Sequence, residues 1–429
     1  MEMQSWAFML FVVVSAALYW SVVPAKLRPH YLLAVSLGYY FACSIVFGVF
    51  LLLYLYGIFV LGILIDTSPT KRGRKTWLLF GILAAIGILF LFKARTGLTQ
   101  IVFMLLGMGG GKMAAAMVEK FGIPLGISYF SFRAVHYLVE VYRGKNLRAT
   151  PLEFFLYVTF FPTLVAGPIH RFFTIGKESP EDSFGDQLRA AGGLRKPTAD
   201  DISIGIWRIL QGVVKKFVIA DFFLKLAGPM MTKQGLAPTV GTLELWVAGY
   251  FWFFYLYADF SGYSDMAIGM ARLFGIRVME NFRWPLLASN LRDFWRRWHI
   301  SLTNWLMHYV YIPLGGSRKG EMRTNVNLLL TLIAIALWHK LAVSMFFWGV
   351  YHGVGMILFR YYLRAKNRLM PERKPTWYGM VVGVILVHTY FNISWPMFHH
   401  PMHIAVLYYF KMFPFIPKLF PLLRQLLGS

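Results

Sequence analysis

The sequence predicts an all-α polytopic membrane protein with about 10–11 transmembrane or re-entrant helices around a polar tunnel. Two observations lead to this fold class. Only 14% of the 429 residues are charged and 58% are hydrophobic, whereas about 25% of the residues of a soluble domain are charged. The apolar residues also form long continuous runs, unlike the alternating segments of about ten residues that build a membrane β-barrel. Lipid-facing backbone must form its own hydrogen bonds, so we expect these runs to be helices.

The chain is strongly basic, with 43 Lys and Arg against 19 Asp and Glu and a formal net charge of +24. In a soluble protein such a charge would indicate nucleic-acid binding. In a membrane protein, basic loops gather on the cytoplasmic side and face anionic lipid, so we expect a lipid bilayer as partner and no nucleic acid. The single cysteine, Cys43, excludes an internal disulfide and a cysteine-rich metal site.

The first part of the chain contains four apolar segments that we expect to span the membrane: Trp6–Val23, Tyr31–Val46, Phe47–Ile65 and Trp77–Phe92. No Lys or Arg precedes the first segment, which therefore lacks the basic start of a secretory signal peptide. We expect this segment to be retained with the N-terminus outside. Basic residues gather at Lys71–Lys75, and we interpret this stretch as a cytoplasmic loop because positive loops stay inside.

Proline and glycine interrupt the segments that follow. Phe121–Gly144 contains Pro124 and Gly126, and Pro151–Ile169 is interrupted in the same way. Both segments are therefore predicted to be broken or re-entrant. The run Gly107–Lys112 resembles a phosphate-binding loop, but no Ser or Thr follows its lysine and no strand precedes it. We interpret it as a flexible connection.

The remaining chain alternates apolar segments with charged ones. Lys177–Asp201 has mixed charge with Gly and Pro, and we expect it to be a surface loop. Arg364–Lys374 is a second basic stretch, interpreted as a cytoplasmic loop. Further spans are expected at Ile202–Leu226, Val240–Tyr257, Val343–Tyr362 and Trp377–Trp395. We find no repeat and no soluble second domain, so residues 1–429 are expected to form a single membrane-embedded domain.

The stretch Asn290–Lys340 has the most informative pattern. Plotted as a helix at 100° per residue, its first half divides into a polar and an apolar stripe. The polar stripe contains Arg292, Arg296, His299 and Thr303, and the apolar stripe contains Trp295, Trp298, Leu302, Trp305 and Tyr309. Arginines suit lipid phosphate or a phosphorylated ligand. His339 and Lys340 lie in a later apolar segment, where ionisable residues usually mark a functional site in a protein-lined cavity.

Four blocks of this sequence together resemble the membrane-bound O-acyltransferase (MBOAT) family. They are Pro124–Gly144, Phe160–Ile169 (FFPTLVAGPI), Asp259–Gly269 (DFSGYSDMAIG), and Phe294–Gly316 followed by Leu337–His339. The match extends from about Pro124 to His352, residues 124–352, over half of the chain. Within the family, the run YIPLGGSRKG looks most like the bacterial branch that acetylates polysaccharides such as alginate.

The resemblance implies what the protein binds and where it acts. It implies a thioester donor, an acyl-CoA or an acyl carrier protein, and no tightly bound cofactor. It implies transfer of an acyl group, most simply acetyl, to a hydroxyl of a cell-envelope polysaccharide, directly or through an extracytoplasmic acyltransferase partner. The implied location is the bacterial plasma (inner) membrane, in which the protein would be multi-pass.

Two departures from the family pattern bear on the substrate. Lys340 stands where the branch usually has Gly, and Met307 and His308 stand where it usually has Arg-Asp. Both departures leave the two histidines of the pattern, His299 and His339, in place. The alternative that Lys340 raises is an altered or lost activity. The branch that transfers D-alanine towards teichoic acids is similar through the RRWH block and less similar at the PLGG turn.

The residues are consistent with acyl transfer, which requires a base for the hydroxyl and stabilisation of an oxyanion. Burial in a membrane cavity would keep an imidazole neutral, as a base must be, and His339 fits this description best. His299 resembles the second functional histidine of the family and would orient an acyl carrier or assist proton transfer. For each histidine the alternative is a structural role. Arg292, Arg296 and Lys340 are expected to contact phosphate of the donor, although Lys340 could instead pair with a carboxylate.

Other polar residues have simpler interpretations. We expect Asp259 and Asp265 to cap helix ends near the interface, and the alternative is that they contribute a carboxylate to the cavity. His399, His400 and His403 have a spacing compatible with a metal site, but no carboxylate or cysteine partner was identified, so no metal is expected.

One function of a different class stays open, a non-catalytic transporter or channel with a polar cavity. The paired histidines distinguish the two classes, because a conduit has no need of a base. We therefore expect His299 and His339 to line one shared cavity, although 40 residues separate them.

Overall fold

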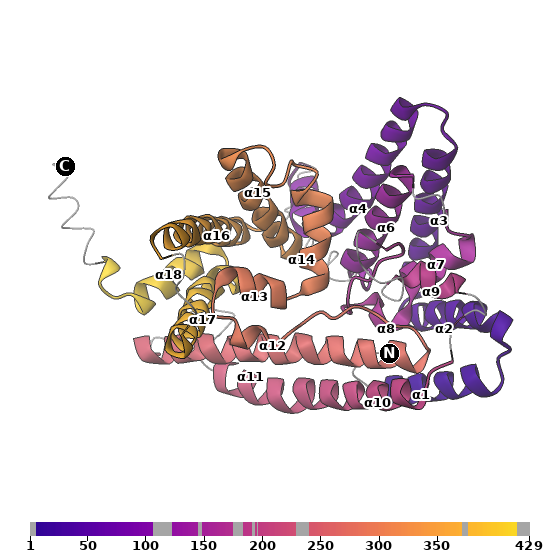
Figure 1. The fold of residues 1–429 in the computed structure, drawn as a ribbon, viewed down its shortest axis with the longest axis horizontal. Helices are drawn as coiled ribbons and strands as arrows, with labels where there is room; N and C mark the ends of the chain where they lie inside the picture. The colour runs from indigo at the N-terminus through magenta and orange to yellow at the C-terminus, as the bar shows by residue number, and fades with distance from the viewer. Residues whose placement is uncertain are drawn as a thin grey trace. The chain divides into compact units, whose positions relative to one another are not determined.

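The computed structural model describes residues 6–105, 122–144, 148–174, 183–190, 194, 196–228, 240–370 and 376–417 (Figure 1). Within these residues the regular structure is helical, apart from one isolated bridge between Arg171 and Ser183. The all-α prediction is confirmed. Three described helices are long and apolar enough to cross a membrane, namely Ile45–Thr67, Lys71–Arg95 and Trp377–His399.

Contacts within the chain define two compact units, and the single domain 1–429 stays a prediction. Unit 1 is Met1–Gln211 with Tyr263–Glu280, and unit 2 is Gly212–Gly262 with Asn281–Ser429. Two helices, α10 (Ala199–Val214) and α12 (Thr242–Leu273), contribute residues to both units. Unit 1 otherwise contains α1 (Trp6–Ser21), α2 (Arg28–Cys43), α3 (Ile45–Thr67), α4 (Lys71–Leu105), α6 (Ile127–Tyr142), α7 (Pro151–Thr159), α8 (Phe161–Leu164) and α9 (Phe184–Arg189).

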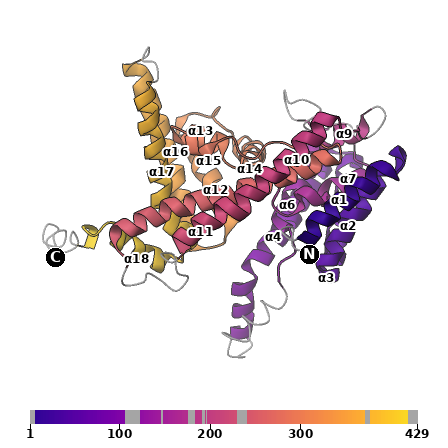
Figure 2. The same cartoon turned by 90° about the horizontal axis from the view of Figure 1, so that it is seen from below.

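Helices α3, α4 and α6 lie side by side in unit 1 (Figures 1 and 2). Gly62 on α3 faces the Tyr137 ring and Gly81 on α4 faces the Leu138 side chain, so closely that an added Cβ would lie 2.7 Å and 2.6 Å from them. The small residues therefore let the large side chains of α6 pack against both neighbouring helices.

The interrupted segments are broken as predicted, and a buried arginine stabilises one of the breaks. Gly126, with φ of 72°, precedes α6, and Phe160 separates α7 from α8. The fully buried Arg133 of α6 donates hydrogen bonds to the carbonyls of Val158 at 2.9 Å and Thr163 at 2.6 Å. These carbonyls lie at the helix ends, where intrahelical partners are missing.

Helix α7 is anchored to α9 by an acidic side chain in its first turn. Thr150 and Glu153 form a capping box, and Arg189 Nε donates to Glu153 Oε1 at 2.8 Å. Burial raises the pKa of the Glu153 carboxyl, but the hydrogen bonds from Arg189 and Thr150 outweigh burial and hold that pKa below its usual value.

Two predictions about loops are wrong where the structure describes these stretches. Lys71–Lys75 forms the first turns of α4, and Arg364 to Arg368 belong to α16 (Val343–Leu369). Residues 371–374 of the second stretch lie outside the described residues. Lys and Arg are good helix formers, so these helices continue past their apolar residues. The cytoplasmic location of both basic stretches stays a prediction.

The charged stretch Lys177–Asp201 is also not a plain surface loop where the structure describes it. It contains α9 and the start of α10, and Ser183, Phe184 and Leu194 are buried. Asp201 accepts from Arg272 at 2.9 Å. Its residues 177–182, 191–193 and 195 lie outside the described residues, as does the predicted connection Gly107–Lys112.

Unit 2 holds the C-terminal helices. Besides the shared helices it contains a π-helical segment (Lys215–Ala220), α11 (Asp221–Ala227), α13 (Leu291–Arg297), α14 (Ile300–Leu306), a second π-helical segment (Met307–Tyr311), α15 (Glu321–His339), α16, α17 (Trp377–His399) and α18 (Met402–Met412). Helices α11 and α12 run side by side (Figures 1 and 2), with Phe223 stacked on Phe254 at a centroid distance of 5.1 Å.

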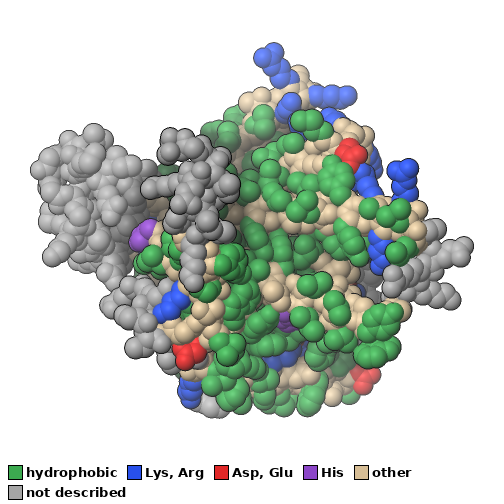
Figure 3. All heavy atoms as spheres, turned by 90° about the vertical axis from the view of Figure 1, so that its left-hand side faces the viewer, with side chains coloured by type: hydrophobic (Ala, Val, Ile, Leu, Met, Phe, Trp, Pro, Cys, Tyr) green, Lys and Arg blue, Asp and Glu red, His purple; other side chains and the backbone are tan. Residues whose placement is uncertain are grey.

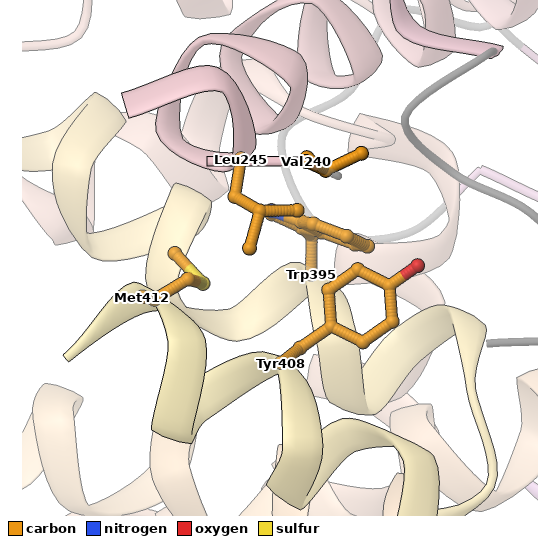
Figure 4. Packing of buried hydrophobic residues seen from close by; sticks show 5 residues of the cluster. All are labelled: Val240, Leu245, Trp395, Tyr408 and Met412. Carbon is orange, nitrogen blue, oxygen red and sulfur yellow. The ribbon is translucent and has the colours of Figure 1, made fainter. Parts of the chain in front are cut away.

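Close helix packing and one apolar cluster stabilise this unit. Gly349 and Gly353 of α16 lie against α15, where added Cβ atoms would lie 2.7 Å from Ile333 Cα and 2.6 Å from Leu329 Cδ1. The cluster joins α12, α17 and α18 and consists of Val240, Leu245, Trp395, Tyr408 and Met412 (Figure 4).

Large hydrophobic side chains cover much of the face drawn in Figure 3. On α16 and α17 the exposed ones include Phe346, Phe347, Leu358, Ile385 and Leu386. Exposed apolar surface on this scale suits contact with lipid.

The block DFSGYSD lies inside α12, so the prediction that Asp259 and Asp265 cap helix ends is wrong. Asp259 forms an ion pair with Lys216 of the π-helical segment. Asp265 pairs with Arg208 of α10 at 2.8 Å. Each carboxylate has a cation in its own unit, which offsets the cost of burying charge in a helix interior.

Candidate active site

The predicted continuous helix through the polar stripe is broken at His299. Helix α13 ends at Arg297, Trp298 is extended with φ −101° and ψ 126°, and His299 is left-handed with φ 44° and ψ 53°. The polar stripe of Arg292, Arg296, His299 and Thr303 is therefore divided between α13 and α14.

A second stretch of chain causes the break. The carbonyl of Asn281 accepts from Ile300 N at 2.9 Å, and Arg283 N donates to the carbonyl of Arg297 at 3.0 Å. These bonds replace helical hydrogen bonds between α13 and α14. They also hold His299 in a conformation that is unfavourable for any residue other than glycine.

The same Asn281 determines which nitrogen of His299 carries the hydrogen. Its Oδ1 lies 3.0 Å from His299 Nδ1 and also accepts from Ser301 Oγ at 2.9 Å. Because this oxygen can only accept, Nδ1 is the protonated nitrogen of the neutral imidazole and Nε2 has the lone pair. His299 is 2% exposed, and within the described residues its Nε2 has no hydrogen-bond partner. The lone pair is therefore available to a substrate.

His299 and His339 both line one cavity of about 100 Å³ in unit 2. Its walls are mainly aromatic and come from α12, α13, α14, α15, α16 and α17. Thr303 and Ser394 are the other polar side chains that we find in the wall. The structure thus places the two histidines at the same cavity, as the sequence led us to expect.

The expectation that His339 is the buried histidine is wrong. His339 is the last residue of α15, and its side chain is exposed. Lys340 follows in an extended conformation and is exposed too. His339 reaches the cavity from this helix end, where its ring contacts Phe398 at a centroid distance of 5.3 Å. The deeply buried imidazole is that of His299.

The three predicted phosphate contacts are exposed, two of them on α13 and the third at the end of α15. Arg292 and Arg296 are on α13, one turn apart, and Arg292 lines a second cavity of about 200 Å³. Lys340 lies within electrostatic range of His399 and His400.

Comparison with known proteins identifies the family. A family model for the membrane-bound O-acyltransferases matches residues 75–399, which include Asn281, His299 and His339. The chain belongs to the membrane-bound O-acyltransferase family. The resemblance predicted from the four blocks is confirmed, and the family match extends beyond the predicted core on both sides.

The chain is similar to curated proteins whose names give acceptors of several kinds. The chain is 35% identical over 354 residues to the "Probable alginate O-acetylase AlgI" of Pseudomonas syringae pv. tomato, over 82% of this chain and 62% of the relative. It is 29% identical to the peptidoglycan O-acetyltransferase of Helicobacter pylori, over 78% of this chain and 63% of the relative. It is 30% identical to the teichoic acid D-alanyltransferase of Bacillus subtilis, over 64% of this chain and 70% of the relative. The chain therefore spans less than two thirds of the length of the first two relatives.

Sequence reasoning missed two residues of this O-acyltransferase-family chain that lie at or behind the cavity. One is Asn281, which lies 18 residues before His299, and the chain from residue 281 to residue 290 is not α-helical. The other is His352 of α16, which is 0% exposed and packs behind the wall residues Trp348 and Phe391, at centroid distances of 4.1 Å and 4.9 Å. Within the described residues neither ring nitrogen of His352 has a hydrogen-bond partner. A lone histidine in an apolar segment is the only sequence signal that could have pointed to it.

The other four histidines named in the sequence analysis are not among the residues that line the cavity. His308 Nδ1 lies 2.8 Å from the carbonyl of Asn304 in the π-helical turn. His399 packs on Trp252 at a centroid distance of 4.1 Å, and His400 stacks on Tyr408 at 4.6 Å. His403 is exposed on α18.

Proposed function

We propose that this chain is an O-acyltransferase that moves an acyl group, most simply acetyl, from a cytoplasmic thioester donor to a hydroxyl of a cell-envelope polysaccharide. The proposed location is the bacterial inner membrane. Transfer occurs directly or through an extracytoplasmic acyltransferase partner. The observation that carries the proposal is the unpartnered Nε2 of His299, held in a fixed tautomer at a cavity that His339 also lines.

The two histidines suit complementary tasks in acyl transfer. His339 removes the proton of the attacking hydroxyl while the hydroxyl oxygen forms a bond to the thioester carbon. The carbon–sulfur bond then breaks, and the proton passes to the leaving sulfur. His299 accepts a hydrogen bond at Nε2, which orients the acyl carrier of the donor or assists this proton transfer. Asn281 is a positioning residue, because it acts only through His299.

The aromatic walls of the cavity support this chemistry by excluding water. A thioester in a wet site would lose its acyl group to hydrolysis. Trp252, Trp295 and Trp298 are among the wall residues. Three cations attract phosphate groups of the donor in this proposal, namely Arg292, Arg296 and Lys340.

A second candidate function is transfer of D-alanine to teichoic acid-type polymers. It is supported by the 30% identity to the Bacillus subtilis teichoic acid D-alanyltransferase, over 64% of this chain. The two candidates share the hydroxyl acceptor and the thioester donor and differ in the acyl group.

Acyl transfer by the purified protein in lipid nanodiscs tests the proposal. The donors are labelled acetyl-coenzyme A and a labelled D-alanyl carrier-protein thioester, supplied with polysaccharide acceptors. We expect His339→Ala and His299→Ala each to lower the rate by about 10²- to 10⁴-fold, the usual contribution of a general acid or base. His403→Ala is the matched control, since His403 is exposed and lies on α18. Wild-type rates in both cavity variants would refute the proposed chemistry, and no transfer from either donor would favour a conduit.

A further inference from the structure

Unit 2 contains a second cavity, of about 200 Å³, whose lining differs from that of the histidine cavity. Arginines line it from two helices, Arg292 from α13 and Arg360 from α16. Tyr311 lines it from the second π-helical segment, Ser317 from the turn that follows this segment, and Thr324 from the first turn of α15. The Thr324 hydroxyl already donates to the carbonyl of Gly320 at 2.7 Å, whereas the hydroxyls of Tyr311 and Ser317 can donate to a ligand. No carboxylate is among the described lining residues.

The charges of the two arginines are not neutralised within the described residues. Neighbouring arginines are paired: Arg297 donates to Asp293 at 2.8 Å, and Arg364 forms an ion pair with Glu321. No carboxylate of the described chain pairs with Arg292 or Arg360. The Arg360 side chain is instead held by Asn325, whose Oδ1 accepts from Nη1 at 2.6 Å. Two like charges at one cavity repel each other, and an anion bound between them would offset this repulsion.

The shape of an arginine side chain narrows the choice of anion. Guanidinium groups match the oxygens of phosphate in a two-pronged geometry, and hydroxyl groups can add further donors. Apolar side chains complete the lining, namely Leu328, Met356 and Phe359. We infer that this cavity binds the phosphate group of an organic phosphate, with Arg292 and Arg360 as its principal contacts.

The position of the cavity relates it to the histidines. Helix α15 carries Leu328 at this cavity and His339 at the other, 11 residues or about 16 Å further along the helix axis. Helix α13 likewise carries Arg292 at one cavity and Trp295 at the other. A thioester donor with phosphates and acyl group at opposite ends of a long arm suits this separation. The assignment of the phosphate to a thioester donor rests on the proposed function. Its assignment to a phospholipid headgroup does not.

Binding measurements test the inference separately from acyl transfer. Adenosine 3′,5′-bisphosphate, which carries donor-like phosphates, is titrated by calorimetry into the full chain in detergent. Phosphatidylglycerol is titrated in parallel and followed by native mass spectrometry. We expect Arg292→Gln and Arg360→Gln each to weaken binding of at least one probe by about ten- to a hundredfold. Arg364→Gln, four residues from Arg360 on the same helix but paired with Glu321, should bind as the wild type does.

The outcomes distinguish the donor from a lipid headgroup as the source of the phosphate, and one outcome would overturn the inference. A loss confined to the bisphosphate assigns the site to the donor, and a loss confined to the lipid assigns it to a headgroup. Ser317→Phe keeps both arginines and fills the cavity, so it should reproduce the loss even if an arginine variant fails to fold. Binding of both probes unchanged in folded Arg292→Gln and Ser317→Phe would overturn the inference. Loss of acyl transfer in His339→Ala with probe binding intact would leave the inference standing.

Discussion

Replacement of Asn281 by alanine tests whether this residue holds His299 in its working tautomer. The change removes the oxygen that accepts from His299 Nδ1 at 3.0 Å and from Ser301 Oγ at 2.9 Å. The third contact, from Ser301 N, is 3.4 Å long and contributes little. A buried donor left without a partner costs about 1–3 kcal/mol. Two such donors predict a loss of about 2–6 kcal/mol of stability, less where water enters the space left by the side chain.

Loss of the tautomer should lower the rate of transfer more than it lowers donor affinity. Misplacement of a reacting group by about 1 Å costs about 10²-fold in rate, so we expect kcat of Asn281→Ala to fall by about that factor with little change in KM. Asn304→Ala is the control. Asn304 lies on α14, the short helix that follows His299, and its side chain forms no hydrogen bond within the described residues.

Asn281→Asp separates orientation from stability. It retains an accepting oxygen, so it should restore most of the melting temperature lost in the alanine variant. Its negative charge favours the imidazolium form of His299, whereas transfer requires the neutral form. The acidic limb of the pH–rate profile should therefore move to higher pH. Wild-type rates and an unchanged pH profile in both variants would refute the role assigned to Asn281.

Four further changes are expected to have measurable effects. Lys340→Gly should raise the donor KM or shift the pH–rate profile, and a gain of activity over an inactive wild type would instead indicate a degenerate site. His352→Phe keeps a ring of similar size and removes two unpartnered buried nitrogens, so the melting temperature should rise, and a fall would indicate an unrecognised partner. The lowered pKa of Glu153 contributes stability above the unfolded value of about 4.3 that is lost as pH falls through the folded value. Glu153→Gln should therefore lose less melting temperature on acidification than the wild type does. Cysteines placed in Lys71–Lys75 and Arg364–Lys374 should resist an impermeant label added outside intact cells, and labelling of either stretch would contradict the predicted topology.

Helices whose signal is local could be predicted closely from the sequence. The predicted span Phe47–Ile65 corresponds to α3 at Ile45–Thr67, and Trp377–Trp395 corresponds to α17 at Trp377–His399. A long apolar run specifies a helix because only a helix satisfies the backbone of a single segment in lipid without a partner strand. Charge was less informative about helix ends. Lys71–Lys75 marks where the apolar part of α4 starts, but the backbone stays helical through it.

The break at His299 could not be predicted, because its cause lies elsewhere in the sequence. Between Arg297 and Ile300 there is neither glycine nor proline, so local propensity favours a continuous helix. The hydrogen bonds that interrupt it come from Asn281 and Arg283. A left-handed non-glycine residue costs about 1–3 kcal/mol and persists only where its surroundings fix it. At His299 the backbone carbonyl of Asn281 fixes the neighbouring main chain, and the side-chain oxygen of Asn281 fixes the imidazole. The contact that breaks the helix is therefore also the contact that leaves Nε2 available at the cavity, which explains why the polar stripe identified His299 but gave the wrong geometry for it.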